Sequence, residues 1–246
     1  MREIAADPWA HRRGEPRVFA FLWTAFLFAA TVLTFVAVAS RGHGDVALMR
    51  GAARTLMVIV AAGVVVLWPM VRLSQQPPRN PLTSTAQDLV VVMIPVQAVV
   101  WPQWVLWLAH WPADVVGAVA SVMLAWGVLV GGVLAMTQQQ RALPAARRDQ
   151  AADPGLWWMA GIAAAVVMAS GLAVAGLSKE ADACRSEWML SPITAVLELT
   201  RDRAWTGRSA ATTRAHWVWI AGIGGVGLAA WAAAGASTGA IHGRRR

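Results

Sequence analysis

Histidine is the residue type in this sequence with the widest chemistry, because imidazole ligates metals, holds haem iron and transfers protons. The sequence has five histidines, and His43, His110 and His216 fall at the ends of apolar segments. Asp114 and Glu187 could join these three in a metal site. Their spacing matches no metal-binding motif, and no histidine stands mid-segment, where a bis-histidine haem would need one. We therefore expect neither a metal nor another cofactor.

Motifs of catalysis and nucleotide binding are not found in the sequence. It contains no P-loop, no Ser-x-x-Lys and no His-Glu-x-x-His. The glycine run Gly222-x-Gly224-Gly225-x-Gly227 is only superficially like a phosphate-binding loop, since it lies in an apolar segment and follows no strand. Helix packing explains it better. We expect a protein that is not an enzyme.

Two amide side chains, Gln97 and Gln103, could line a polar path through an apolar segment. Gln97 and Gln103 lie within the predicted third membrane span, and Trp104, Trp107 and Trp111 follow at the spacing of one helical face. Gln97, Gln103, Trp104 and Trp107 are therefore candidates for a substrate path or stacking platform. Such amides more often hydrogen-bond a neighbouring helix, and such tryptophans more often form an aromatic belt.

The longest polar interruption, residues 178–216, contains a short helix signal. Ser191 is a good N-cap and Pro192 suits the first helical position. Ile193 and Leu197 lie on its apolar side and are candidates for a gate, although a surface helix covering the neighbouring spans is the plainer interpretation. The polar side is expected to stay in water and comprises Glu198, Arg201, Asp202 and Arg203.

The elements that must position these residues are long apolar segments. The chain has 246 residues, of which 57% are hydrophobic and 14% charged, whereas soluble domains carry about 25% charged residues. Several segments reach the roughly 20 residues that cross a bilayer as a helix. The fold predicted is all-α, a polytopic integral membrane protein with six transmembrane helices and a short extracytoplasmic helix between spans 5 and 6. The spans expected are about 19–40, 55–71, 89–109, 115–136, 156–177 and 217–237.

These spans make one membrane domain, residues 19–237, between a cytoplasmic N-terminal segment 1–18 and a basic tail 238–246. The prolines of the segment 72–88 exclude regular helix there. Pro95 and Pro102 predict that the third span is kinked or broken.

The basic charge of the chain sets its orientation. The formal net charge is +8, and Lys and Arg collect in short cytoplasmic loops. Counting them places both termini in the cytoplasm and residues 178–216 outside. We expect a bacterial cytoplasmic (inner) membrane protein that contacts anionic lipid and no nucleic acid. Because no charged residue lies deep inside a predicted span, we do not expect proton coupling or voltage sensing.

Small residues at four-residue spacing allow helices to pack closely, within the chain or between subunits of a homo- or hetero-oligomer. The candidates for helix packing are Gly117, Ser121, Gly127, Gly131, Gly161, Ala165 and Gly225.

The segment Ser191-Pro192-Ile193-Thr194-Ala195-Val196-Leu197-Glu198-Leu199 is similar to the proline-led segment before the last span of ABC-2-type export permeases. The six-span topology resembles that family as well. The resemblance implies a dimeric permease subunit of an ATP-driven exporter, with the ATPase on a separate cytoplasmic chain. Residues 72–88 and 137–155 would contact that ATPase.

A second function class fits the same sequence features. A non-catalytic accessory or scaffold subunit of a larger membrane complex would use the small-residue faces and tryptophans to pack partner helices. An adjacent ATPase gene would favour the permease, whereas neighbouring respiratory or photosynthetic genes would favour the accessory subunit.

Overall fold

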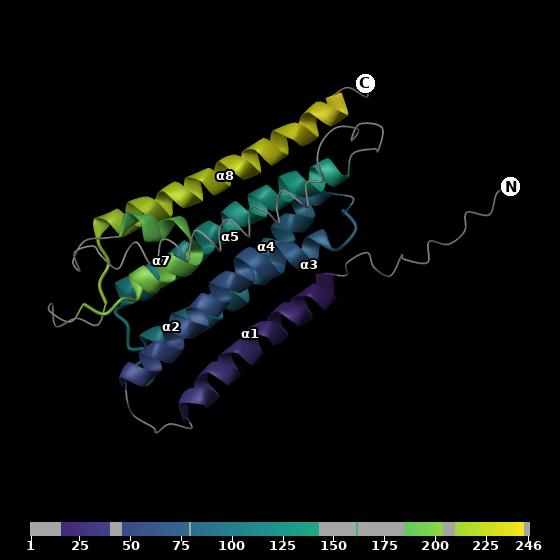
Figure 1. Cartoon of the computed structure of the whole chain (residues 1–246). Coiled ribbons are helices and arrows are strands. Elements are labelled where there is room, and N and C mark those ends of the chain that lie inside the picture. The colour runs from purple at the N-terminus through teal and green to yellow at the C-terminus, as the bar shows by residue number, and fades with distance from the viewer. Residues whose placement is uncertain are drawn as a thin grey trace.

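The computed structural model describes residues 16–39, 46–78, 80–142, 161, 185–203 and 210–243, and the fold is all-helical (Figure 1). The predicted fifth span, 156–177, lies outside these residues except for Gly161. Ala165, the segment 1–15 and the residues from 244 onward also lie outside them.

Five long helical stretches form most of the described fold, and four of them lie in the first 141 residues. These four are α1 (Pro16–Ala39); α2 (Val46–Ala62), continued by the π-turn η2 (Gly63–Leu67) and α3 (Trp68–Leu73); α4 (Pro81–Val100) with the 3₁₀ turn η3 (Trp101–Trp104); and α5 (Ala113–Arg141). The short elements η5 (Ser186–Leu190) and α7 (Pro192–Leu199) precede the last long helix, α8 (Arg214–Gly243).

Five helices of the described chain are long and apolar enough to cross a membrane. Each contains 22 to 29 residues in its apolar stretch, which exceeds the roughly 20 residues that a bilayer requires. These stretches are Arg17–Val38, Val46–Leu73, Pro81–Trp104, Ala113–Arg141 and Arg214–Ala236. Apolar side chains stand exposed along their outer faces, among them Phe21, Phe28, Ile94, Val226 and Leu228.

The helices that contain the second and third predicted spans begin before those spans. α2 begins at Val46, whereas the second span was expected from about residue 55, and α4 begins at Pro81, whereas the third span was expected from about residue 89. Pro81 opens its helix because the first helical position has no intrahelical partner for an N–H. Pro95 lies inside α4 without interrupting it, whereas Pro102 lies in the 3₁₀ turn that ends the span.

The helices pack side by side as a bundle with α5 at its centre (Figure 1). α5 contacts α4, α8 and α7, while α1 contacts α2 and α4. The Trp23 Nε1 of α1 donates to the Val92 carbonyl of α4 over 3.1 Å. Gly63 allows the close approach of α1, because a Cβ at this position would lie 2.6 Å from the Phe26 ring.

At the α5–α8 contact the backbones themselves come close together. A Cβ on Gly227 would lie 2.8 Å from the backbone nitrogen of Leu129, and a Cβ on Gly132 would lie 2.8 Å from the Cβ of Ala230. The Trp231 Nε1 of α8 donates to the Val128 carbonyl of α5 over 2.8 Å. The two helices are therefore held in backbone contact at glycine positions.

Candidate functional site

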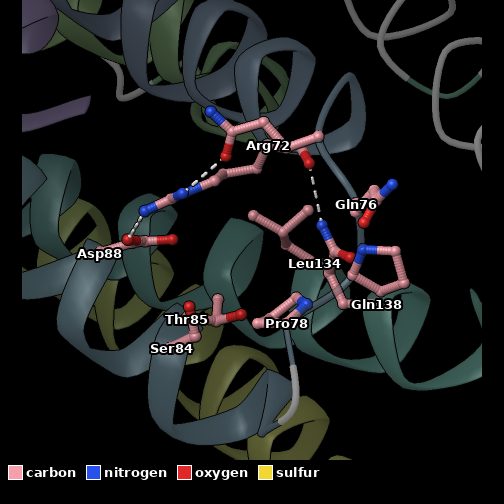
Figure 2. Close-up of a pocket in the computed structure, with 10 residues that line it drawn as sticks. Arg72, Gln76, Pro78, Ser84, Thr85, Asp88, Leu134 and Gln138 are labelled. Carbon is pink, nitrogen blue, oxygen red and sulfur yellow. Dashed lines mark hydrogen bonds and ion pairs between the residues drawn. The ribbon is translucent and has the colours of Figure 1, made fainter. Parts of the chain in front are cut away.

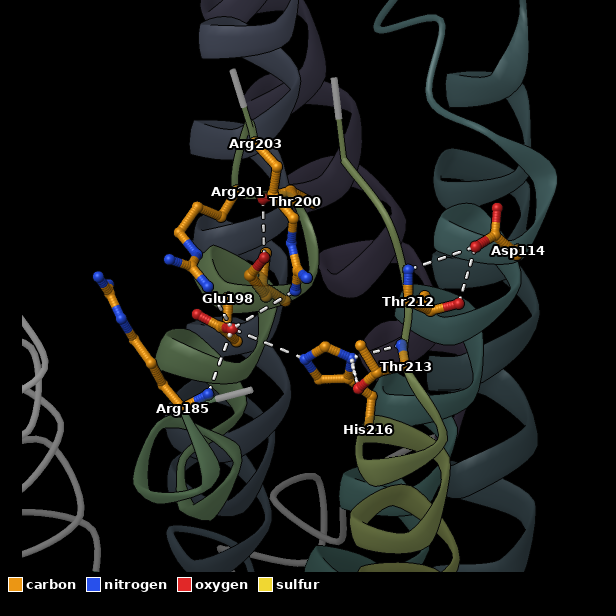
Figure 3. Close-up of polar contacts among 10 residues, drawn as sticks. Asp114, Arg185, Glu198, Thr200, Arg201, Arg203, Thr212, Thr213 and His216 are labelled. Carbon is orange, nitrogen blue, oxygen red and sulfur yellow. Dashed lines mark hydrogen bonds and ion pairs between the residues drawn. The ribbon is translucent and has the colours of Figure 1, made fainter. Parts of the chain in front are cut away.

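Glu198 of α7 is the centre of a buried polar cluster at one end of the bundle (Figure 3). As a whole residue it is 1% exposed. The Oε1 atom lies 3.0 Å from Arg201 Nη2, 3.9 Å from Arg203 Nη2 and 3.7 Å from His216 Nε2. The backbone N–H of Arg185 also donates to this oxygen over 3.4 Å. The carboxylate thus joins α7 to the start of α8 and to the segment before η5.

The hydrogen bonds of His216 fix which of its ring nitrogens carries the proton. The backbone N–H of Thr213 donates to Nδ1 over 2.9 Å. Since an N–H donor requires a lone pair on its acceptor, the neutral imidazole carries its proton on Nε2, which faces Glu198. Protonation of Nδ1 would break the bond to Thr213 in the turn that opens α8.

The charges around Glu198 favour its ionised form. Burial raises the pKa of this carboxyl, but the contact with His216, the positive charge of Arg201 and the backbone N–H of Arg185 oppose it. Their sum places the pKa of Glu198 below its ordinary value. The cluster therefore contains a buried carboxylate that is held by the start of α8 and by the segments before η5 and after α7, and that stays negative.

Arg54 of α2 ties the same end of the bundle together. Its Nη2 donates to the Thr200 carbonyl over 2.5 Å, and its Nε donates to the Thr200 hydroxyl over 3.2 Å. The Nη2 also lies 3.0 Å from Asp202 Oδ2. One turn earlier, Arg50 donates to the Ala109 carbonyl over 3.1 Å. Charged side chains of α2 therefore hold both the end of α7 and the turn before α5.

The prediction that Glu198, Arg201 and Arg203 stay in water was wrong. Glu198 is 1% exposed and Arg203 is 6% exposed. The physical reason is that α7 packs between α2 and α5, so its polar side is satisfied by ion pairs rather than by solvent. Ile193 and Leu197, the candidate gate residues, are half-buried.

A cavity of about 370 Å³ lies at the opposite end of the bundle (Figure 2). Arg72 of α3 and Asp88 of α4 form a buried ion pair beside it. The Gln138 Nε2 of α5 donates to the Arg72 carbonyl over 3.0 Å, and Arg141 Nη1 donates to the Leu73 carbonyl over 2.8 Å. The remaining lining residues are Gln75, Gln76, Pro77, Pro78, Ser84, Thr85 and Leu134.

The Arg72–Asp88 pair places two buried charges within apolar stretches that extend beyond the predicted spans. The predicted boundaries placed both residues just outside a span. The structure places Arg72 within the apolar stretch Val46–Leu73 and Asp88 within Pro81–Trp104. Their side chains are 9% and 5% exposed. Each charge is tolerated near its helix end because the other neutralises it.

The predicted path residues do not come together. Gln97 Nε2 donates to the Ala120 carbonyl of α5 over 3.1 Å, and Gln103 Nε2 donates to the Val99 carbonyl of its own helix over 3.1 Å. Trp104 and Trp107 are 60% and 80% exposed and so point away from the bundle. Trp111 is 2% exposed, because the helix ends at Trp104 and the chain turns back.

The predicted packing residues divide into two groups. At Gly127 a Cβ would lie 2.8 Å from Met93, and at Gly131 it would lie 3.0 Å from Trp231. Ser121 is half-buried on α5. No described residue lies within 4 Å of the Cβ position of the others, which are Gly117, Gly161 and Gly225. The sequence pattern missed Gly63, Gly132 and Gly227, which do make close contacts.

No family model, no curated protein and no solved structure matches this chain.

Proposed function

We propose that this chain is a bacterial inner-membrane protein and the permease subunit of an ATP-driven exporter, with its ATPase on a separate chain. Five helices long and apolar enough to cross a bilayer support the membrane location. The basic residues of the short loops favour cytoplasmic termini, which places the Arg72 cavity inside and the Glu198 cluster outside.

The observation that carries this proposal is the attachment of α7 across the outer end of the bundle. Arg54 holds its last turn through Thr200, and His216 faces its Glu198 across the contact with α8. The apolar side of α7, which includes Val196 and Leu199, belongs to the hydrophobic core, so opening of α7 must break this packing as well as its polar contacts. An exporter needs such a closure on the outer side, and α7 would open when its contacts with α2 and α8 separate.

At the inner end of the bundle, the segment between α3 and α4 is exposed and is also hydrogen-bonded to α5. Gln76 and Asn80 are exposed between α3 and α4. The same segment is joined to α5 through Gln138 and Arg141, which bond the carbonyls of residues 72 and 73. A cytoplasmic ATPase that presses on this segment would move α3, α4 and α5 together. The mainly apolar interior between the two ends suits a lipid-like or amphiphilic substrate.

Affinity purification from native membranes, followed by mass spectrometry, tests the permease. A P-loop ATPase should be recovered with the wild type and less of it with Gln76→Glu, which adds a charge to the proposed contact. Ala113→Glu adds the same charge to an exposed position at the other end of the bundle, and recovery should not change. Recovery of a large membrane complex without an ATPase would overturn the proposal.

The alternative is a non-catalytic accessory or scaffold subunit, and α1 is the feature that favours it. Only a narrow stripe of α1, including Phe19, Trp23 and Leu27, is buried in the bundle. Several other apolar side chains of α1 are exposed, among them Phe21, Phe28 and Leu33, which suits a partner helix as well as lipid. The same purification distinguishes the two functions through the proteins recovered.

A further inference from the structure

We propose that the cavity between α3, α4 and α5 binds the ethanolamine phosphate group, through acceptors of Asp88, Gln138 and Thr85 and a donor of Arg72. Its volume of about 370 Å³ falls among those of small-molecule sites, about 300–1,000 Å³. The inference rests on the membrane location proposed above but not on transport.

The hydrogen-bond donors that line the cavity are mostly used within the protein. Arg72 Nη1 donates to Gln75 Oε1 over 2.7 Å, and Arg72 Nη2 pairs with Asp88 Oδ1. Gln138 Nε2 donates to the Arg72 carbonyl over 3.0 Å, and the Thr85 hydroxyl donates to the Pro81 carbonyl over 2.8 Å. A ligand would therefore meet more acceptors than donors here.

Two hydrogen-bond acceptors that line the cavity can each accept a further hydrogen bond. Gln138 is 3% exposed, and its Oε1 has no hydrogen-bond partner among the described residues. The amide cannot simply be turned round, because its Nε2 is needed by the Arg72 carbonyl. Arg72 engages only Oδ1 of Asp88, which leaves Oδ2. A primary ammonium, with three N–H donors, satisfies acceptors of this kind.

One buried donor requires an acceptor on the same ligand. Arg72 Nε has no hydrogen-bond partner among the described residues. A phosphate oxygen two carbons away from the ammonium would supply one, so a zwitterionic ethanolamine phosphate matches both needs. A choline group would not, because its quaternary nitrogen has no N–H to donate.

The position of the cavity suits a headgroup as well as a free ligand. Asp88 stands seven residues after the start of α4 at Pro81, about 10 Å along the helix at 1.5 Å per residue. Arg72 lies closer to the end of its own apolar stretch, one residue before Leu73, so the cavity reaches from the headgroup region of a bilayer into the edge of its hydrocarbon core. Leu134 provides an apolar wall, and Pro77 and Pro78 stiffen the rim of the cavity.

The test uses the purified full chain and native mass spectrometry of bound lipid, with thermal stability as a second measurement. Phosphatidylethanolamine should be retained at least about tenfold more than phosphatidylcholine with the same acyl chains. Free O-phosphoethanolamine is added separately. Stabilisation by it alone would assign the site to a soluble ligand, and stabilisation by the lipid alone would assign it to a headgroup.

Substitutions of lining residues test whether the cavity causes the preference for phosphatidylethanolamine over phosphatidylcholine. Gln138→Leu removes the buried acceptor, and Thr85→Val keeps the side-chain volume while removing an oxygen. Both should abolish most of the preference for ethanolamine. Gln97→Leu removes a hydrogen bond between α4 and α5 outside the cavity, and it should keep the preference. Equal retention of the two lipids with no effect of O-phosphoethanolamine, or a preference that survives Thr85→Val, would overturn the inference. Since no ATPase takes part, its failure is separate from failure of the permease proposal.

Discussion

The imidazole of His216 faces the carboxylate of Glu198 across the contact between α8 and α7, with 3.7 Å between Nε2 and Oε1. Both side chains are 0% exposed. Because Thr213 occupies Nδ1 of the imidazole, the proton on the ring points towards the carboxylate. The contact therefore brings a buried carboxylate and a ring N–H of fixed orientation together from two helices.

Replacing Glu198 by Gln should destabilise the fold. The substitution leaves Arg201 and His216 facing a neutral amide, and removing one partner of a buried ion pair costs about 3–5 kcal/mol. For a chain of this size the lower figure lowers the Tm by roughly 6–12 °C, measured by thermal unfolding in detergent. Asp114→Asn is the control, because Asp114 is an exposed carboxylate at the same end, and it should cost about 1 kcal/mol or less. Equal shifts in the two variants would contradict the assigned role of Glu198.

The stability of the fold should fall at acidic pH in a way that depends on Glu198. Its pKa in the folded protein lies below the ordinary value of 4.5, so the unfolded chain binds more protons at pH values between the two. The stabilisation is present above pH 4.5 and is lost as the pH falls through the lowered pKa. Thermal unfolding from pH 7 to about pH 3 should show this loss in the wild type, and Glu198→Gln should show a smaller slope. An identical slope in the variant would contradict the lowered pKa.

Hydropathy predicted the long helices well because the length of an apolar run is a property of the local sequence. The first and fourth predicted spans, 19–40 and 115–136, differ from α1 and α5 by a few residues at most ends. The helices that contain the second and third predicted spans begin before those spans. Val46–Thr55 and Pro81–Asp88 contain polar and charged residues that hydropathy assigns to loops, whereas in the structure both segments are helical and α4 buries Thr85 and Asp88.

The two polar clusters could not be predicted from local sequence, because their partners come from different helices. Arg72 and Asp88 are separated by a loop, and Arg54 is 146 residues from Thr200. An amphipathic pattern says which side of α7 is polar but not whether that side meets water or arginine. A helix start, by contrast, has a local signal, and Pro192 occupies the first position of α7.

The α5–α8 contact should be sensitive at Gly227 and insensitive at Gly225. A Cβ at Gly227 would lie 2.8 Å from a backbone nitrogen of α5, whereas no described residue lies within 4 Å of the Cβ position at Gly225. Gly227→Ala should therefore cost about 1–3 kcal/mol through overpacking, and Gly225→Ala should be neutral. The Tm of the two variants in detergent checks this. A larger loss at Gly225 would show that an unseen partner packs there.

The tryptophans around the turn before α5 should differ in their contribution to stability. Trp111 is 2% exposed and Trp107 is 80% exposed. Trp111→Ala should cost about 3–5 kcal/mol, as large-to-small core substitutions do, while Trp107→Ala should leave the Tm in detergent nearly unchanged. Comparable Tm losses would contradict the outward orientation of Trp107 and return it to the interior as a path residue.

The closure of α7 should depend on the guanidinium of Arg54. Arg54 donates to the carbonyl and the hydroxyl of Thr200 from separate nitrogens, and a lysine ammonium cannot reproduce that fork. Hydrogen bonds to charged groups contribute about 1.5–3 kcal/mol, so Arg54→Lys should increase the opening of α7 by about tenfold or more. The measurement is the rate of thiol labelling at Val196→Cys, a fully buried position, with Cys184→Ser as background.

Arg50→Lys is the matched control for this measurement. Arg50 lies one turn earlier on α2 and bonds the Ala109 carbonyl rather than Thr200. Its other contact, a 3.9 Å ion pair with Asp202, needs only the positive charge that lysine keeps, so the labelling rate at Val196→Cys should change little. If α7 is the outer closure of an exporter, its labelling in Arg54→Lys should also become less dependent on the transport cycle, because the state that the cycle reaches is already populated. Equal labelling rates in the Arg54→Lys, Arg50→Lys and unsubstituted backgrounds would show that Arg54 does not hold α7, and the permease proposal would lose the observation that carries it.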